Sequence, residues 1–286
     1  MTKIAVFSDV HGNMTALSAV LEDSLARGAT EHFFLGDLLL PGPGAADLFS
    51  CLEEVNASVC IRGNWDDCFL EVLNGEVDLN DPSDLYLTML VRHIYGEMKY
   101  SDIMKLKSWP THDVIEIEGL RIGLSHNLPN KNYGGFLYPT NPQENFEALF
   151  DGNELDIAIF AHIHRPIFRY SNQEQLILNP GSVGHPYHGW EKFQKDVRAE
   201  YLLLEIDETG VKGTEFRKVN YDKAFEFQKA KQQRHPYLSL YEELLKTGRS
   251  YTHDYERLET FHVDSVYKRE AQHFLAQLKS EKSRQV

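Results

Sequence analysis

Five short apolar runs in this chain each end at a residue whose side chain can bind a metal ion. The residues that follow the runs are Asp9, Asp37, Asn64, His126 and His162. In an open α/β sheet, the side chains at the carboxyl ends of the strands converge on one crevice, even when they are far apart in the sequence. The pattern therefore predicts an α/β protein with a metal site at one end of its sheet.

From Lys3 to about Arg62 the chain alternates between strand and helix patterns. The run that ends at Asp9 gives way to residues 13–28, whose apolar positions recur at helical spacing and which end at a glycine. A second apolar run, a Pro/Gly turn, a helix near residues 45–55 and a third run follow. Strand, helix, strand, helix, strand is typical of a right-handed parallel arrangement, which we expect here.

The pattern changes after Leu73. Residues 76–110 read as a mostly helical insertion, with Asp-Pro-Ser-Asp as its helix start, and would sit beside the crevice. Two β-rich runs then meet at a tight Glu118-Gly119 turn, which predicts a hairpin. A helix near residues 142–150 and further short strands follow, so the second half is expected to be more antiparallel than the first.

Two regions are expected, a catalytic domain over residues 1–219 and a helical C-terminal extension over residues 220–286. Beyond Asn220 the composition shifts to long charged helices rich in Lys, Glu and Gln, with few β-branched residues. Their amphipathic faces must pack on something. We therefore interpret the extension as a cover on the core or as a contact between subunits of a homo-oligomer, rather than as an independent functional domain.

Composition narrows the class of protein. A length of 286 residues with 42% hydrophobic content can build one large domain with a core. The formal net charge of −14 argues against a nucleic acid as partner, because tracking along its backbone needs clustered Lys and Arg. No run approaches the ~20 apolar residues of a membrane span, and we expect neither a membrane partner nor a signal peptide. Three cysteines without a C-x-x-C pair indicate free thiols, so the expected location is cytoplasmic.

The ligand-type residues are spaced so that they can share ions. Asp9 and His11 lie two apart, and His162 and His164 repeat this spacing. In extended backbone, positions i and i+2 point to the same side, so each pair can bind one ion. Asp37 offers two carboxylate oxygens and can bridge two ions. A donor set of imidazole and oxygen without sulfur favours Mn²⁺, Fe²⁺ or Zn²⁺.

Charge favours a phosphate as the bound group. Two divalent ions, partly neutralised by Asp9 and Asp37, leave a surplus of about two positive charges that a bridging hydroxide and a phosphate could balance. A phosphoester or phosphoanhydride is therefore the expected substrate. The expected partner is a small phosphorylated molecule, in particular a nucleotide.

The motifs resemble a known family. They are Ser-Asp-Val-His-Gly-Asn at residues 8–13, Gly-Asp at 36–37, Gly-Asn-Trp-Asp at 63–66, Ser-His-Asn at 125–127 and Ala-His-Ile-His at 161–164. Their order resembles the calcineurin-like metallophosphoesterase superfamily from about residue 3 to residue 217. Asn-Pro-Gly-Ser-Val-Gly at residues 179–184 resembles the branch that contains small bacterial phosphodiesterases. The resemblance implies a four-layer αββα sandwich of two mixed sheets with a dinuclear site.

The resemblance also assigns residues to roles by position. It implies two divalent or mixed-valence ions, Mn²⁺, Fe²⁺/Fe³⁺ or Zn²⁺. Asp9, His11, Asp37 and His164 would hold one ion, and Asp37, Asn64, His126 and His162 would hold the other. In the family, the Asn of the first motif often contacts substrate phosphate, which makes Asn13 a catalytic candidate, with Arg62 as a weaker one.

One residue departs from the family pattern. Many members carry a His directly after the Asn of the third motif, and that His is assigned to protonating the leaving group or positioning the phosphate, whereas this chain has Trp65. General-acid help is commonly worth about 10²–10⁴-fold, so cleavage without it should favour groups that leave readily as anions. His185, Tyr187 and His188 follow the glycine-rich turn, and His185 is a candidate for a substitute acid. Trp65 itself is interpreted as a packing residue, and Asp66 as a support behind the site.

The sequence therefore predicts a hydrolase of phosphodiester or phosphoanhydride bonds, acting by attack of a metal-bridging hydroxide. Nucleoside triphosphates, dinucleoside polyphosphates and activated aryl diesters are the expected substrates. A phosphomonoesterase, including a protein phosphatase, is one alternative, and the absent histidine counts against it. A nuclease is another, disfavoured by the acidic charge. A non-catalytic scaffold with the same fold is a third, disfavoured by the complete set of ligands.

Overall fold

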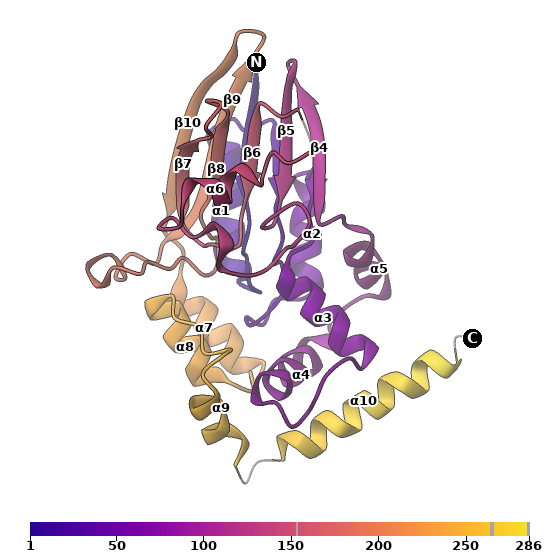
Figure 1. The fold of residues 1–286 in the computed structure, drawn as a ribbon. Coiled ribbons are helices and arrows are strands. Elements are labelled where there is room, and N and C mark those ends of the chain that lie inside the picture. Colours follow the sequence, from indigo (N-terminus) through magenta and orange to yellow (C-terminus); the bar gives the residue numbers. More distant parts are fainter. Residues whose placement is uncertain (153, 264–265, 285–286) are drawn as a thin grey trace.

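The computed structural model describes residues 1–152, 154–263 and 266–284 and contains two five-stranded sheets that face each other (Figure 1). The first sheet contains β1 (Thr2–Phe7), β2 (Glu31–Phe34), β3 (Val59–Cys60), β9 (Ala199–Asp207) and β10 (Gly210–Val219), in the order β10-β9-β1-β2-β3. Strands β1, β2 and β3 are parallel, and β9 runs antiparallel to β1 and β10. Helices α1 (Met14–Ala26) and α2 (Ala46–Glu54) connect the parallel strands, which confirms the predicted alternation.

The second sheet is also mixed. It contains β4 (His112–Ile117), β5 (Leu120–Ser125), β6 (Ile157–Phe160), β7 (Pro166–Tyr170) and β8 (Leu176–Pro180), in the order β4-β5-β6-β8-β7. Strands β5, β6 and β8 are parallel, while β4 and β7 are antiparallel edge strands. Glu118 and Gly119 both adopt positive φ, of 51° and 83°, as a two-residue hairpin turn requires. The predicted hairpin is therefore confirmed.

Three apolar layers hold the sandwich together. Outside the first sheet, Phe7 and Phe34 pack with Leu17 of α1 and Leu48 of α2. Between the sheets lie side chains of both, among them Val6, Leu35, Ile122, Ile159 and Leu178. Outside the second sheet, Phe160 packs against Phe146 of α6 (Gln143–Glu147) and against Leu137 of the short 3-10 helix η1 (Gly135–Leu137). This is the expected αββα order.

Helix α6 is shorter than the sequence pattern suggests. The helix predicted near residues 142–150 is α-helical only from Gln143 to Glu147. The amide of Leu149 bonds to the carbonyl of Phe146 and that of Phe150 to Glu147, three residues back, so the last turn is of 3-10 type. The outer layer on the second sheet is accordingly thin.

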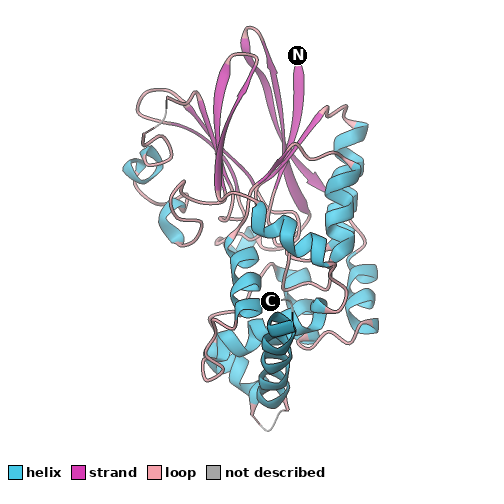
Figure 2. Ribbon diagram, turned by 90° about the vertical axis from the view of Figure 1, so that its right-hand side faces the viewer, coloured by secondary structure: helices cyan, strands magenta, loops and turns pink. Residues whose placement is uncertain are grey.

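The helical insertion and the helical extension lie together at one end of the sandwich (Figures 1 and 2). The insertion follows α3 (Asn64–Asn74) and contains α4 (Pro82–Tyr95) and α5 (Tyr100–Ser108). Asp81 caps α4 by accepting from the Ser83 amide at 2.7 Å, with Pro82 as the first helical residue, as predicted. The extension contains α7 (Lys223–Gln232), α8 (Leu238–Thr247), α9 (Tyr255–His262) and α10 (Tyr267–Arg284).

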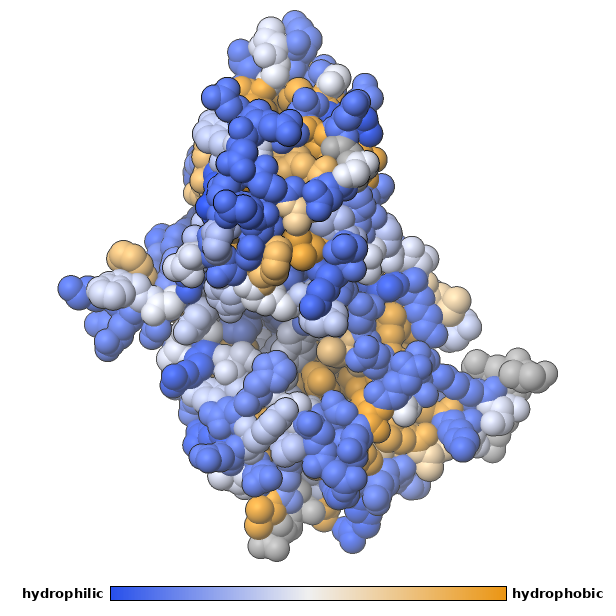
Figure 3. All heavy atoms as spheres, in the orientation of Figure 1, coloured by the Kyte–Doolittle hydropathy of each residue, from blue (hydrophilic) through white to orange (hydrophobic). Residues whose placement is uncertain are grey.

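The extension packs on the insertion. Helix α10 contacts α3 and α4, and α9 contacts α4. Tyr95 of α4 donates its hydroxyl to Glu281 of α10 at 2.9 Å. Figure 3 shows apolar residues gathered around the junction of α3, α4 and α10, where Leu73 lies near Leu275 and Leu278. Among the helices of the described residues, none has the length and apolar character needed to cross a membrane.

Candidate metal centre

The seven predicted metal ligands come together at one end of the two sheets. Asp9 and Asp37 follow β1 and β2 of the first sheet, while His126 and His162 follow β5 and β6 of the second. His164 brings its Nε2 to 3.1 Å from Asp9 Oδ1. Asp37 Oδ2 lies 3.2 Å from His126 Nε2, so side chains of both sheets meet.

The remaining two predicted ligands, His11 and Asn64, lie in the same group. His11 Nε2 lies 3.7 Å from Asp37 Oδ2, and Asn64 Oδ1 lies 3.1 Å from His126 Nε2. Asp37 thus contacts histidines on two sides, as a bridging carboxylate would. We call these residues the metal cluster: Asp9, His11, Asp37, Asn64, His126, His162 and His164.

The backbone of the metal cluster differs from the expectation. The sequence spacing predicts extended backbone at the Asp9/His11 and His162/His164 pairs, and this is wrong. Left-handed φ values, between 52° and 65°, occur at Asp9, His11, Asp37, His162 and His164. Non-glycine residues adopt this region rarely and at a cost, so it is found where surrounding contacts enforce it.

Backbone hydrogen bonds enforce these turns in the first sheet. The amide of Asp9 donates to the carbonyl of Gly36 at 2.9 Å, and that of His11 donates to Asp37 at 3.0 Å. Gly12 and Gly42 approach so closely that a Cβ on Gly12 would lie 2.4 Å from the Gly42 oxygen. The turns after β1 and β2 are therefore held against each other, with their ligands on one side.

Backbone carbonyls fix the orientation of three imidazole rings. The Nδ1 atoms of His11, His126 and His164 donate to the carbonyl oxygens of Leu40, Leu35 and His185 at 2.7, 2.7 and 2.6 Å. With the proton on Nδ1, a neutral ring keeps a lone pair on Nε2, and that atom faces the centre of the cluster. His162 differs, because its buried Nδ1 has no hydrogen-bond partner among the described residues.

The centre of the metal cluster is rich in acceptors and poor in donors. His11 Nε2 and His164 Nε2 face each other at 3.2 Å, although both rings have their proton on the other nitrogen. Asp9 Oδ1 and Asp37 Oδ2 are buried without a hydrogen-bond partner in the part of the chain that the structure describes. Buried acceptors are normally satisfied. These residues therefore fit one or more metal cations, which would satisfy the facing lone pairs.

The electrostatics of the cluster point the same way. Burial opposes ionisation of Asp9 and Asp37, but the neighbouring histidines hold the pKa of each carboxyl below its usual value. Burial also disfavours a charged His126, yet Asp37 and Asp9 raise the pKa of that ring to about 10. His11 and His162 respond in the opposite sense, because burial lowers the pKa of each to about 4. The two carboxylates thus demand positive charge.

Two further hydrogen bonds orient the carboxylates of Asp9 and Asp37. Asp9 Oδ2 accepts from the Ser8 hydroxyl at 2.6 Å, and Asp37 Oδ1 accepts from the Trp65 amide at 2.8 Å. These bonds leave the other oxygen of each carboxylate directed at the histidines. The Trp65 ring stands edge-on to His11, with 5.4 Å between ring centroids, which supports its interpretation as a packing residue.

Asp66 lies behind the cluster, as predicted. It is fully buried and accepts from the amides of Asp37 and Gly63 at 2.9 and 3.0 Å, and from Leu38 at 3.0 Å. Burial, together with the charge of Asp37, raises the pKa of Asp66 to about 7. This side chain joins the turn after β2 to the start of α3.

Two of the predicted catalytic residues are engaged in other contacts. Asn13 caps α1 by accepting from the Ala16 amide at 3.0 Å, and it donates to the Tyr221 hydroxyl at 3.1 Å. Arg62 donates to Asp67 at 2.6 Å and to the carbonyl of Lys107 at 3.0 Å. Their roles toward a substrate stay predictions.

His185, the third catalytic candidate, lies against the metal cluster. Its ring centroid is 4.5 Å from that of His164 and 5.3 Å from that of His11. Its Nε2 donates to the carbonyl of Gly248 at 2.8 Å, and burial holds its pKa well below the usual value. In this neutral form the free Nδ1 can accept a hydrogen bond but has no proton to donate. His188 is directed elsewhere, with Nε2 3.8 Å from Glu200.

A cavity of about 300 Å³ opens beside the metal cluster. Its lining includes Tyr138, His162, His164, His185, Tyr187, Gly248, Arg249 and Ser250. The last three belong to the C-terminal extension, and the sequence analysis did not single them out. The charged helices that follow Asn220 gave no signal that the chain returns to the metal cluster.

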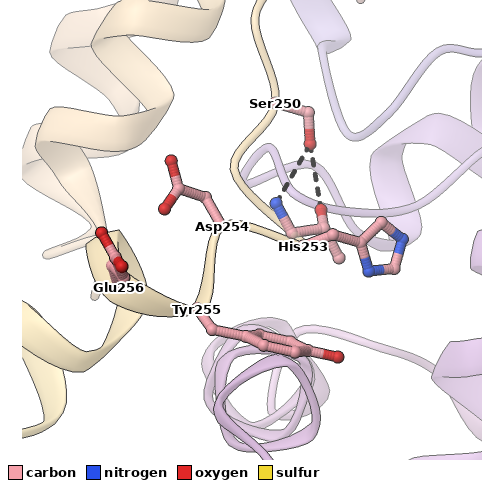
Figure 4. Close-up of a pocket in the computed structure, with 6 residues that line it drawn as sticks. Ser250, His253, Asp254, Tyr255 and Glu256 are labelled. Atoms are coloured by element: carbon pink, nitrogen blue, oxygen red, sulfur yellow. Dashed lines mark hydrogen bonds between the residues drawn. The ribbon is translucent and has the colours of Figure 1, made fainter.

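A larger hollow of about 570 Å³ lies farther along the extension and contains no ligand of the cluster. Figure 4 shows the Ser250 hydroxyl bonded within its turn, with the carboxylates of Asp254 and Glu256 directed away from the His253 ring. Asp254 caps α9 by accepting from the Arg257 amide at 3.0 Å. This hollow is a feature of the turn before α9, and the smaller cavity is the candidate substrate site.

Comparison with known proteins agrees with this site. The sequence profile of the calcineurin-like phosphoesterase superfamily domain matches residues 2–209. An uncharacterised protein of Methanocaldococcus jannaschii is 27% identical over 226 residues, which cover 71% of this chain and 88% of that protein. The phosphodiesterase YfcE of Escherichia coli K12 is 27% identical over 198 residues, covering 66% of this chain and 83% of YfcE. The resemblance inferred from the motifs is confirmed.

Two solved structures share the fold. A hypothetical protein from Pyrococcus horikoshii OT3 has a TM-score of 0.70 at 20% identity, covering 87% of this chain and 100% of that one. A metallophosphoesterase from Sphaerobacter thermophilus has a TM-score of 0.64 at 23% identity, with the same coverage. At these identities the likeness shows the fold alone, and it agrees with the predicted sandwich.

Proposed function

This chain belongs to the calcineurin-like phosphoesterase superfamily, and we propose that it hydrolyses phosphodiester or phosphoanhydride bonds with two metal ions. The Nε2 atoms of His11 and His164, which face each other at 3.2 Å, and the orphaned oxygens of Asp9 and Asp37 carry this proposal. Such a set of acceptors in a buried centre is costly without cations.

The geometry supports a division of the cluster between two ions. Asp9, His11 and His164 lie on one side of Asp37, and Asn64, His126 and His162 lie on the other. Divalent ions bound there would lower the pKa of a coordinated water and offset the charge of a phosphate. Mn²⁺, Fe²⁺/Fe³⁺ and Zn²⁺ suit this mixture of imidazole and oxygen donors.

The chain's own residues position the ions and the substrate. The carbonyls of Leu35, Leu40 and His185 hold three rings in the tautomer that directs Nε2 inward. The Trp65 amide binds Oδ1 of Asp37, which leaves Oδ2 facing both His11 and His126. Both carboxylates stay ionised, so the site without metal carries negative charge that would repel a phosphate. Bound cations would reverse this charge and allow a phosphate to bind.

The site favours substrates whose leaving group departs as an anion. Trp65 occupies the place where many family members carry a proton-donating histidine, and it packs on His11. His185 is neutral with its free nitrogen as an acceptor. Activated aryl diesters and nucleoside polyphosphate anhydrides are therefore the proposed substrates, in preference to alkyl phosphates.

A substrate panel with added Mn²⁺ tests the proposal. We expect hydrolysis of an aryl diester and of nucleoside triphosphates, with an unactivated alkyl diester cleaved about 10²-fold more slowly or worse. His164→Asn should lose activity and bound metal, and His273→Asn, the same change at an exposed position of α10, should keep both. Less than one ion per chain, with no activation by Mn²⁺, would instead support a non-catalytic scaffold.

A further inference from the structure

The cavity beside the metal cluster is walled by three segments that are far apart in the sequence. Tyr138 comes from the loop before α6, Tyr187 from the loop after β8, and Arg249 and Ser250 from the C-terminal extension. A volume of about 300 Å³ lies at the lower end of the range for small-molecule sites. The extension thus forms a wall of the candidate substrate site.

A close backbone contact joins the extension to the metal cluster. Gly248 ends α8 with a φ of 67°, and its carbonyl accepts from His185 Nε2 at 2.8 Å. A Cβ on Gly248 would lie 2.1 Å from the carbonyl oxygen of Pro186, so no side chain fits there. Since His185 packs on the ligand His164, the position of Gly248 is fixed relative to the cluster.

The segment that follows is also held at its far end. We call residues 248–254 the strap. Ser250 bonds to Thr252 within the strap, and the carbonyl of Thr252 accepts from the hydroxyl of Ser83 in α4. Asp254 ends the strap and caps α9 by accepting from the Arg257 amide. Contacts at both ends therefore hold Arg249 beside the cavity.

Arg249 has no carboxylate within 4.0 Å among the residues that the structure describes, and its side chain contacts the Tyr251 hydroxyl. Arg165, which directly follows the ligand His164, also lacks an acidic partner within that distance in the described ranges; its Nε donates to the carbonyl of Tyr187 at 3.2 Å. Arg249 lines the cavity, and Arg165 lies over the ring of Tyr187, which lines it as well. Two cations near one cavity provide a local positive potential for an anion.

We infer that the strap binds the part of the substrate that lies beyond the bond to be cut, with Arg249 contacting a phosphate of a nucleoside polyphosphate. The inference rests on the proposed function and names the substrate class of the same site. Arginine binds phosphate through two parallel N–H donors, a geometry suited to a terminal phosphate. Tyr138 and Tyr187 line the same cavity, and aromatic rings suit contact with a nucleobase.

Hydrolysis of an anhydride releases an anionic leaving group, which a cation such as Arg249 can stabilise. Water oxygen forms a bond to the phosphorus held at the metal cluster, and the bond from that phosphorus to the bridging oxygen breaks. The leaving phosphate keeps the electron pair and departs as an anion, while the proton of water passes to solvent. Arg249 would stabilise the leaving anion by charge, so no proton donor is needed.

Kinetics of Arg249→Gln in the full chain loaded with Mn²⁺ test this inference. For a nucleoside triphosphate we expect KM to rise about 10-fold or more, since hydrogen bonds to charged groups commonly contribute that much. For an aryl diester, which has no second phosphate, kcat/KM should stay within about twofold of wild type. Arg249→Lys should recover part of the loss. Lys246→Gln, the same loss of charge at an exposed position of α8, should change neither substrate.

Calorimetric titration with a non-hydrolysable nucleoside triphosphate analogue gives a readout that does not depend on turnover. We expect weaker binding to Arg249→Gln than to wild type and to Lys246→Gln. Unchanged binding of the analogue, or an equal loss of activity on both substrates, would overturn the inference. If no substrate is hydrolysed with Mn²⁺, the proposed function fails, and the titration still decides whether Arg249 binds the phosphate chain.

Discussion

The metal cluster and the C-terminal extension border the same cavity but are held in different ways. The ligand-bearing turns are tied to one another by backbone hydrogen bonds, such as Asp9 to Gly36 and His11 to Asp37, inside the sandwich. The extension reaches the cavity through one close contact, at Gly248, and otherwise packs on the helical insertion, on α1 through α7, and on the loop after β2 through His235. This difference implies that metal binding and substrate binding can be separated by mutation.

The largest effect is expected from a substitution within the metal cluster. Asp37→Asn removes the carboxylate that lies between the two groups of histidines, and it leaves His126 without its nearest negative partner at 3.2 Å. We expect activity to fall to background on every substrate and bound metal to drop, as measured by metal analysis of the dialysed protein. The extension should stay folded, which helical circular dichroism would show. Retention of two ions per chain would contradict the proposed bridging position.

One buried histidine of the extension should contribute to the pH dependence of stability. Burial lowers the pKa of His235, which is 5% exposed and whose Nε2 donates to the carbonyl of Pro41 at 2.7 Å, to about 4. The unfolded chain binds this proton near its usual pKa of about 6.5, so the free energy of unfolding should fall as the pH drops from about 6.5 to about 4. A difference of this size corresponds to at most about 3 kcal/mol.

His235→Gln should make that fall less steep, because the replacement side chain does not titrate. Denaturant unfolding at several pH values measures the slope, and only the slopes are compared, since the substitution also changes packing on Tyr241. Identical slopes for the two proteins would show that His235 has no part in the pH dependence.

A smaller effect is expected when the contact between Gly248 and Pro186, which joins the extension to the sandwich, is disturbed. Gly248→Ala introduces a Cβ that collides with Pro186 and forces alanine to a φ of 67°. Gly75→Ala is a matched control, because Gly75 also has a positive φ, of 80°, with nothing within 4 Å of its added Cβ. Both should lose about 1 kcal/mol from backbone strain. Only Gly248→Ala should lose more and weaken nucleotide binding, with metal content unchanged in both.

The smallest expected effect lies farthest from the cavity. Tyr95→Phe deletes the hydroxyl that donates to Glu281 of α10 and should cost about 1 kcal/mol or less in thermal unfolding. Activity and metal content should equal those of wild type. A loss of activity would mean that α10 contributes to the site and that the two regions are not separate.

The strand-end ligands could be predicted from sequence because parallel strands place their carboxyl ends together whatever the loop lengths. The hairpin at Glu118 and the cap at Asp81 followed from local turn and cap preferences. The left-handed backbone at Asp9 and His162 could not be predicted, because it depends on partner loops of other strands. The early end of α6 could not be predicted either, because the apolar pattern does not distinguish an α-helical last turn from the 3-10 turn that follows Glu147.

The role of Arg249 could not be predicted from the sequence for a different reason. Nothing in the order of residues around Arg249 differs from other charged positions of the extension. Its place at the cavity depends on the bond from Ser83 of α4 to Thr252 and on the fit of Gly248 against Pro186. Periodicity reports which face of a helix is apolar, but it carries no information about where the helix returns to the core.

Asp66 has a consequence for the spacing of the proposed ions. One buried carboxylate accepts from the amides of Asp37 and of Gly63, which directly precedes Asn64. It therefore sets the separation between a ligand on the β2 turn and a ligand at the start of α3 without itself belonging to the cluster. In an Asp66→Asn variant the side-chain NH2 would oppose the amides of both Asp37 and Gly63, or, in the other orientation, the amide of Leu38. The distance between the ions, and with it the preference for one metal over another, could thus be changed by a residue that contacts neither ion.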